Sequence, residues 1–222
     1  INQKASFENF FCSPDNHYLI KQLSDFVSSN DAHELIISGE KGVGKSFLTQ
    51  AICNELGLKD KKSGFIPMNK AINMDIEIFQ DLASLDVVCI DDFQLILANR
   101  DWEKALFHLI NECQQSSCSL ILSLGDTKPL EEVTQLPDLL SRIKRMEFMR
   151  LRAVQNEQLK QALSFVSLQL NINIEAAELD YLLKHQTREF SLLVENLLLL
   201  DLQAASLKRR ITIPLIKETL KL

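Results

Sequence analysis

The stretch Gly39-Glu40-Lys41-Gly42-Val43-Gly44-Lys45-Ser46 decides the fold of this 222-residue chain, because it matches G-x-x-x-x-G-K followed by Ser or Thr in full. Its glycines let backbone N–H groups turn inward on a row of phosphates, and a helix starting at Lys45 adds its positive dipole end. In this pattern Lys45 reaches the β- and γ-phosphates and the Ser46 hydroxyl ligates Mg²⁺. The stretch therefore predicts a site for ATP or ADP with Mg²⁺. The alternative is a glycine-rich turn without a ligand.

The segments around this loop predict a parallel sheet covered by helices. Residues 34–38 form a short apolar run that reads as a buried strand, and residues 45–56 carry apolar side chains at helical spacing. Pro67 would place the second strand at an edge of the sheet. Alternating strands and helices are typical of an α/β fold with a parallel sheet. The further strands are expected at 64–68, 87–91, 119–124 and 146–151.

The pattern changes near Arg152, after which it indicates helices only. Residues 155–170, 175–185 and 189–207 have helical periodicity, and a last short helix has Pro214 in its first turn. Residues 189–207 are apolar almost all round, which predicts the centre of a small bundle. The sequence thus predicts a nucleotide-binding α/β domain at 1–150 and a small helical domain at 151–222.

Acidic residues follow two of the expected core strands. Val87-Val88-Cys89-Ile90-Asp91-Asp92 places carboxylates at the carboxyl end of a strand, where open α/β sheets bind ligands. Asp91 would hold Mg²⁺ and Asp92 could orient an attacking water, although a helix cap would look the same. Asp126, after the next strand, could contact the terminal phosphate. An ordinary turn before Pro129 is the alternative.

A basic run begins at Arg142 and continues through Lys144, Arg145, Arg150 and Arg152. Such a run is usually a solvated face. The sharper interpretation is that Arg142 is an arginine finger, because a planar and permanently charged guanidinium suits the charge that develops on a transferred phosphoryl group.

Composition narrows the classes of partner. The formal net charge of −6 and the pI of about 5.3 argue against a surface that neutralises many DNA phosphates, so no sequence-specific DNA binding is expected. Five cysteines without a C-x-x-C spacing indicate reduced thiols. No apolar run approaches the roughly 20 residues of a membrane span, so we expect a cytoplasmic protein that does not enter membranes. The chain begins at Ile1 without an initiator Met, which leaves room for a preceding segment.

Nearly the whole chain resembles the DnaA/Hda family of AAA+ proteins. Residues 90–94 are similar to the family's magnesium-site segment, 124–129 to its sensor 1 segment, 136–142 to its arginine-finger segment and 211–218 to the end of its lid. The resemblance implies Asp126 as the sensor and Arg142 as the finger. It also implies that the segment with Phe10 and Asn16 wraps the adenine, and we add Phe47, which follows the glycine-rich loop.

The resemblance implies a sheet in the order 5-1-4-3-2 and a function in controlling replication initiation. The nucleotide-bound protein would dock on ATP-loaded DnaA together with the sliding clamp and supply Arg142 to the DnaA active site. AAA+ contacts would also allow a homo-oligomer. The family's DNA-reading domain is not expected, because the chain stops at Leu222, and no clamp-binding peptide is found before Phe7.

The chain departs from the family at one position of the lid. The sensor 2 arginine aligns with Ser191, and Arg188, one turn earlier, could substitute if both share a helix face. This departure predicts weak intrinsic hydrolysis. It opposes the alternative that the chain is an ATP-hydrolysing machine such as a helicase loader or an initiator ATPase domain, which Asp92 favours. A small-molecule kinase is a third alternative, but no acceptor-binding pattern stands out.

Overall fold

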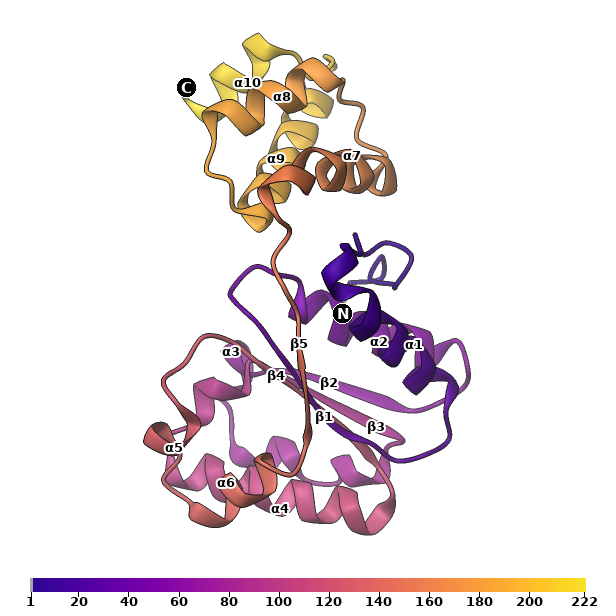
Figure 1. Ribbon diagram of the computed structural model, residues 1–222, viewed down its shortest axis with the longest axis vertical. Coiled ribbons are helices and arrows are strands. Elements are labelled where there is room, and N and C mark those ends of the chain that lie inside the picture. Colours follow the sequence, from indigo (N-terminus) through magenta and orange to yellow (C-terminus); the bar gives the residue numbers. More distant parts are fainter. Residues whose placement is uncertain (1) are drawn as a thin grey trace.

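The computed structural model describes residues 2–222, and its centre is a five-stranded parallel sheet (Figure 1). The strands lie in the order β2-β3-β4-β1-β5, which confirms the order implied by the family resemblance. β2, with Pro67, occupies one edge as the sequence predicts, and β5 occupies the other. The bounds are β1 Glu34–Ser38, β2 Ser63–Pro67, β3 Val87–Asp91, β4 Ser119–Leu124 and β5 Glu147–Arg150.

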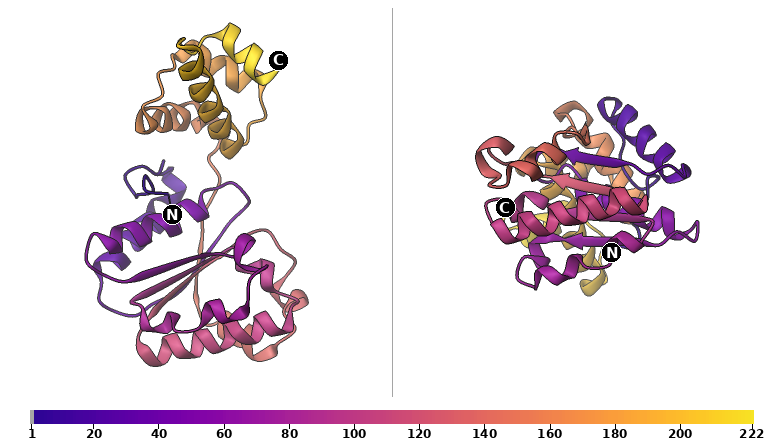
Figure 2. Two further views of the ribbon diagram at one scale, coloured as in Figure 1. Left: turned by 180° about the vertical axis from the view of Figure 1, so that it is seen from behind. Right: turned by 90° about the horizontal axis from the view of Figure 1, so that it is seen from below.

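Helices cover both faces of the sheet, as Figures 1 and 2 show from opposite sides. Strand β1 illustrates the reason: Leu35 and Ile37 pack on the side of α1 His17–Ser28 and α2 Lys45–Gly57, while Ile36 packs on the side of α4 Arg100–Ser116. α6 Pro137–Ile143 lies against α4. Each fully buried aliphatic side chain of this kind stabilises the fold by about 1.5–3 kcal/mol. The short helices α3 Met68–Ala71 and α5 Leu130–Val133 complete the layers.

The residues after β5 form a helical lid with its own core. Its helices are α7 Leu159–Leu170, α8 Ala176–His185, α9 Phe190–Leu207 and α10 Ile213–Leu220. α9 packs into this core through Leu193, Leu197 and Leu200. The sequence predicted α9 as the centre of the bundle; it contributes to the lid core, but Leu198, Leu199 and Leu202 are exposed. The three other lid helices cover only one face of α9.

Within the described residues, α9 is long and apolar enough to cross a membrane by length and composition. The core helix of a globular domain meets the same criterion. Leu193, Leu197 and Leu200 of α9 pack against the other lid helices in that manner.

The chain segment before α1 ties the lid to the sheet domain. Asn16, which is buried, donates from Nδ2 to the carbonyl oxygen of Arg152 and accepts the Arg152 N–H at Oδ1, both at 2.9 Å. Phe11 packs edge-on against Phe165 of α7, with ring centroids 5.8 Å apart. The N-terminal segment therefore contacts both domains where the chain passes from one to the other.

Candidate functional site between the sheet edge and the lid

The glycine-rich loop joins β1 to α2 in a conformation that requires glycine at two positions. Gly42 and Gly44 have φ values of +81° and +103°. A Cβ at Gly44 would lie 2.8 Å from Cε2 of Phe10, and one at Gly42 would lie 2.4 Å from Oγ of Ser191. Neither the backbone angles nor the space tolerates a side chain. The loop therefore keeps the backbone at the start of α2 open for an anion.

Lys45 is held inside this loop. Its Nζ donates to the carbonyl oxygens of Gly39 at 2.9 Å and Glu40 at 2.8 Å, and the side chain is almost fully buried. Burial lowers the pKa of Lys45, while the carboxylates of Asp92, Asp126 and Asp91 act to raise it. The ammonium thus stands near three carboxylates, a charge arrangement that suits phosphate with a divalent cation.

Asp91 ends β3 and is buried beside two hydroxyl groups. Ser123 on β4 donates from Oγ to Oδ1 of Asp91 and accepts the N–H of Asp92 at 2.7 Å. Burial raises the pKa of Asp91, and the hydrogen bonds from Ser123 and Ser46 lower it. Ser46 and Asp91, the predicted Mg²⁺ ligands, therefore lie together. Ser123 was not predicted, although its hydroxyl within an apolar strand was the available signal.

Gln94 connects the ends of β3 and β4. Its Nε2 donates to Oδ1 of Asp92 at 3.1 Å, and its Oε1 accepts the N–H of Gly125 at 2.8 Å. Asp92 has a left-handed backbone, with φ of +57°, which is uncommon for a residue other than glycine and concentrates at functional sites. Gln94 fixes this carboxylate. It lies in the segment 90–94 of the family resemblance, but no role was predicted for it.

Asp126 lies against the glycine-rich loop, where its Oδ2 accepts the N–H of Lys41 at 3.2 Å. A cavity of about 480 Å³ brings together predicted residues of the loop and of both strand ends: Lys41, Gly42, Gly44, Lys45, Ser46, Asp92 and Asp126. Gln94 and Gly125, for which no role was predicted, complete its lining. Among residues 2–222 no cluster of three His, Cys, Asp or Glu side chains can hold a metal alone. Mg²⁺ would therefore take its remaining ligands from phosphate and water.

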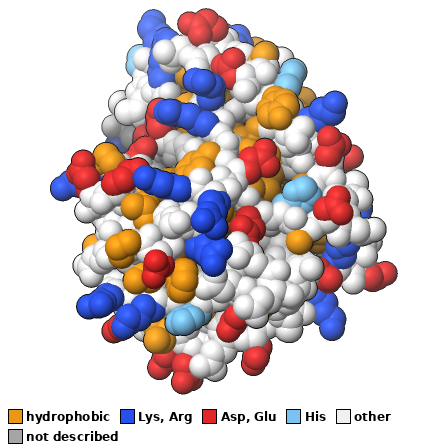
Figure 3. Space-filling model, turned by 60° about the horizontal axis from the view of Figure 1, so that its bottom comes forward, with side chains coloured by type: hydrophobic (Ala, Val, Ile, Leu, Met, Phe, Trp, Pro, Cys, Tyr) orange, Lys and Arg blue, Asp and Glu red, His pale blue; other side chains and the backbone are white. Residues whose placement is uncertain are grey.

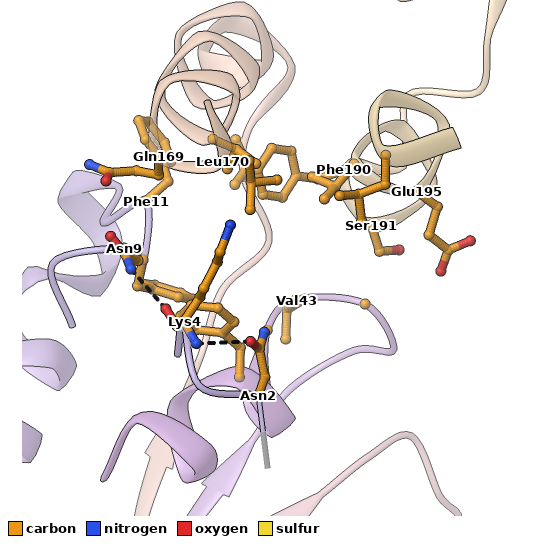
Figure 4. A pocket seen from close by; sticks show the side chains of 18 of the residues that line it. Asn2, Lys4, Asn9, Phe11, Val43, Gln169, Leu170, Phe190, Ser191 and Glu195 are labelled. Carbon is orange, nitrogen blue, oxygen red and sulfur yellow. Dashed lines mark hydrogen bonds between the residues drawn. The ribbon is translucent and has the colours of Figure 1, made fainter. Parts of the chain in front are cut away.

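A second cavity of about 340 Å³ opens between the sheet domain and the lid, next to the loop (Figure 4). Phe10, Asn16, Val43 and Phe47 line it from the sheet domain, and the rings of Phe10 and Phe47 are 6.1 Å apart. The lid side is mostly apolar and consists of Val166, Gln169, Leu170, Phe190, Ser191, Val194, Glu195 and Leu198. An apolar slot beside a phosphate cradle fits a nucleotide base. The Nδ2 and Oδ1 atoms of Asn16 both bond the backbone of Arg152, so this side chain forms part of the cavity wall.

The lid residues beside the loop are Ser191 and Glu189 rather than Arg188. Ser191 donates to Oε1 of Glu189 at 2.9 Å, and both side chains lie next to Gly42. Arg188 is exposed and precedes the first residue of α9, Phe190, so the expected helix face shared with Ser191 does not form. Arg188 lines neither cavity.

Arg142 lies near the amino ends of the strands, at the opposite end of the sheet from the glycine-rich loop. Its Nη1 donates to Oε1 of Gln114 at 3.3 Å, and Gln114 donates from Nε2 to Oε2 of Glu34 at 3.1 Å. Glu34 begins β1, and the glycine-rich loop follows the other end of that strand. At about 3.3 Å per residue the strand separates these ends by roughly 13 Å. Arg142 therefore belongs to a different face from Lys45.

Glu103 positions the helix that carries Arg142. This fully buried carboxylate accepts N–H groups from Ala98 at 2.9 Å, Gln135 at 3.0 Å and Leu136 at 2.7 Å. Leu136 is the N-cap of α6. α4 thus holds α6 near both of its ends, through Glu103 and through Gln114. Neither residue was predicted, because these contacts join segments far apart in the sequence.

Comparison with known proteins places the whole chain in one family. A family model for the bacterial DnaA ATPase domain matches residues 1–148, and one for the Hda lid domain matches residues 156–220. An uncharacterized protein of Haemophilus influenzae is 30% identical over 218 residues, covering 98% of this chain and 94% of that protein.

Solved structures show the same fold. Domain III of Thermotoga maritima DnaA matches 100% of this chain and 97% of that one at 19% identity, with a TM-score of 0.82. Aquifex aeolicus DnaA with AMPPCP bound has a TM-score of 0.73 at 19% identity, covering 93% of this chain and 70% of that one. The Thermotoga maritima RuvB branch migration motor, at 18% identity, has a TM-score of 0.65 over 97% and 73%. Since both of its domains match, the chain belongs to the DnaA/Hda family of AAA+ proteins.

Proposed function

We propose that this chain is a cytoplasmic, nucleotide-bound regulator of replication initiation that docks on ATP-loaded DnaA and accelerates its ATP hydrolysis. The finger would be Arg142, acting on the nucleotide of DnaA, with the sliding clamp as a further partner. The observation that carries this proposal is the combination of a DnaA-type ATPase domain with an Hda-type lid over the full chain.

The position of Arg142 supports action in trans. The cavity with Lys45, Asp92 and Asp126 lies at the carboxyl ends of the strands. Arg142 is linked through Gln114 to Glu34, at the amino end of β1. A guanidinium on that face cannot contact the chain's own phosphates. It can, however, reach a nucleotide on a neighbouring AAA+ domain.

The chain's own nucleotide would then be structural. Its base would fill the cavity between the domains, and its phosphates would lie on the loop with Lys45 and Mg²⁺ at Ser46 and Asp91. A serine and a carboxylate face the loop from the lid at Gly42, where an arginine would be needed to neutralise a γ-phosphate. This arrangement supports ADP as the resident nucleotide and slow intrinsic hydrolysis.

Single-turnover hydrolysis by ATP-loaded DnaA tests the proposal, with clamp and DNA present. Arg142→Ala should keep its own ADP affinity and thermal stability but lose the acceleration, since a finger supplied in trans contributes roughly 10³–10⁵ in rate in GTPases. Arg142→Lys should fail nearly as badly, because lysine lacks the planar fork. Arg209→Ala, which removes an exposed arginine of the lid, is the matched control and should stimulate normally. Full stimulation by Arg142→Ala would place the finger elsewhere.

A second candidate is an ATP-hydrolysing machine, which the ordered Asp92 favours. Gln94 holds the Asp92 carboxylate at the mouth of the phosphate cavity, where it could orient a water. Steady-state turnover by the isolated chain distinguishes the two candidates. Brisk hydrolysis that Asp92→Ala abolishes would favour the machine, whereas turnover at background level supports the regulator.

A further inference from the structure

The edge strand β5 leaves an aromatic side chain half exposed. Phe148 pairs in register with Ile36 of β1, and Ile36 is fully buried under α4. Phe148 is 47% exposed, because β5 is the last strand of the sheet and the α4 layer does not extend over it. Edge strands are normally protected by charge or by a covering element. An apolar side chain on an uncovered edge strand lies where another molecule can pack or pair.

Positive charge surrounds Phe148. Arg145 precedes the strand, and Arg150 lies two residues after Phe148 and so on the same face. Both are exposed, and within residues 2–222 neither forms an ion pair, whereas nearby Lys144 pairs with Glu131 at 2.7 Å. Arg142 reaches the same region through Gln114, which contacts Glu34. Glu34 directly precedes Leu35, and Leu35 pairs with Glu147 of β5. Figure 3 views the molecule from the end with α4 and α6, where Lys and Arg side chains lie beside hydrophobic ones.

We infer that Phe148, with Arg145 and Arg150 beside it, is the docking anchor for the nucleotide-bearing face of DnaA, the partner named in the proposed function on which this inference rests. Aromatic and arginine side chains dominate the binding energy of protein interfaces. In this chain the equivalent face carries Lys41 and Lys45 beside Asp92 and Asp126, so its side-chain charges balance and the phosphates of a bound nucleotide would make it negative. We expect the same of the nucleotide-bearing face of DnaA. Arg145, Phe148 and Arg150 form a basic strip with an apolar centre, which complements that face. This strip adjoins Arg142.

Nucleic acid is a less suitable occupant. A single aromatic ring gives no platform for successive bases, and the chain has a net charge of −6. A second copy of this chain also carries a nucleotide-bearing face of this kind. Evidence that the strip binds nucleic acid or a second copy of this chain, and not DnaA, would overturn the inference.

The roles of Phe148 and Arg142 are separable. Phe148 would act in binding alone and Arg142 in the chemical step. A Phe148→Asp variant should therefore need a higher concentration to stimulate DnaA but should reach the wild-type maximal rate. Arg142→Ala should bind and yet fail to stimulate at any concentration.

The experiment measures the affinity of the full chain, loaded with ADP, for immobilised ATP-loaded DnaA. Phe148→Asp should weaken binding by about 30-fold, as for an interface anchor. Phe148→Leu should stay near wild type, because it keeps the apolar contact. Arg150→Glu, an exposed charge reversal that leaves the sheet intact, should weaken binding and remove part of its salt dependence. Leu58→Asp is the matched control, since Leu58 is 82% exposed at the end of α2, away from β5.

Wild-type affinity in both Phe148→Asp and Arg150→Glu would overturn the inference while leaving the proposed function intact. The inference also fails if these variants lose only single-stranded oligonucleotide binding or only self-association. If the wild-type chain neither binds nor stimulates DnaA, the proposed function fails, and the docking anchor fails with it.

Discussion

The ammonium of Lys45 is the side-chain cation that the chain directs at phosphate, and its removal gives the sharpest prediction at the scale of one residue. Lys45→Ala should reduce ADP and ATP affinity at least about 100-fold, because a charge-assisted contact in a partly buried site is lost. The fold should persist, since the alanine still continues α2. Calorimetric titration with each nucleotide measures the effect, and circular dichroism checks the fold. Unchanged affinity in a folded variant would contradict the assignment of the loop.

Single residues also show where sequence reasoning stops. Gly44, Lys45 and Asp91 could be predicted because each belongs to a local pattern that the chemistry of phosphate and Mg²⁺ imposes. The role of Ser123 could not, nor could the contact of Gln94 with Gly125, although these residues fix the orientation of Asp91 and Asp92. Their roles depend on which strands lie side by side, and spacing along the chain does not encode that.

At the scale of elements, α4 is the support on which α6 and Arg142 rest. Glu103→Ala would leave three backbone N–H groups without their acceptor at a fully buried site. Such groups cost about 1–3 kcal/mol each, so the free energy of unfolding should fall by at least about 2 kcal/mol. Urea denaturation monitored by fluorescence measures this change.

Gln114→Ala is the control for Glu103, because Gln114 is exposed on the same helix. It should leave the denaturation midpoint close to wild type. An unchanged midpoint in Glu103→Ala instead would mean that water replaces the carboxylate at the start of α6.

Strands and lid helices could be predicted from periodicity, but their surroundings could not. The five strands appear close to their expected bounds, and the strand order followed from the family resemblance. The exposure of Leu198, Leu199 and Leu202 on α9 could not be predicted, because a run of leucines shows only that the helix is apolar. Which of its faces are covered depends on the packing of α7, α8 and α10. Arg188 lies in the loop before α9 and not on the helix. This too could not be predicted, since the start of a helix depends on its tertiary contacts.

At the scale of the whole molecule, the two cavities predict that a nucleotide couples the lid to the sheet domain. A ligand that binds only the folded state at 100 times its Kd stabilises it by about 2.7 kcal/mol. For a chain of this size that corresponds to a rise in Tm of roughly 5–10 °C. Differential scanning calorimetry with ADP and Mg²⁺ measures the shift. Lys45→Ala should show little shift at the same ADP concentration, and a wild-type Tm independent of ADP would rule out the coupling.

The paired hydrogen bonds between the Asn16 side chain and the backbone of Arg152 determine the mechanics of the lid. These hydrogen bonds fix the backbone of Arg152 to the sheet domain, and the lid begins beyond that residue. The first element of the lid starts at Asn156, so residues 153–155 are the covalent link between Arg152 and the lid. The N-terminal segment therefore restrains the lid in two ways, through the backbone of Arg152 and through the contact of Phe11 with Phe165.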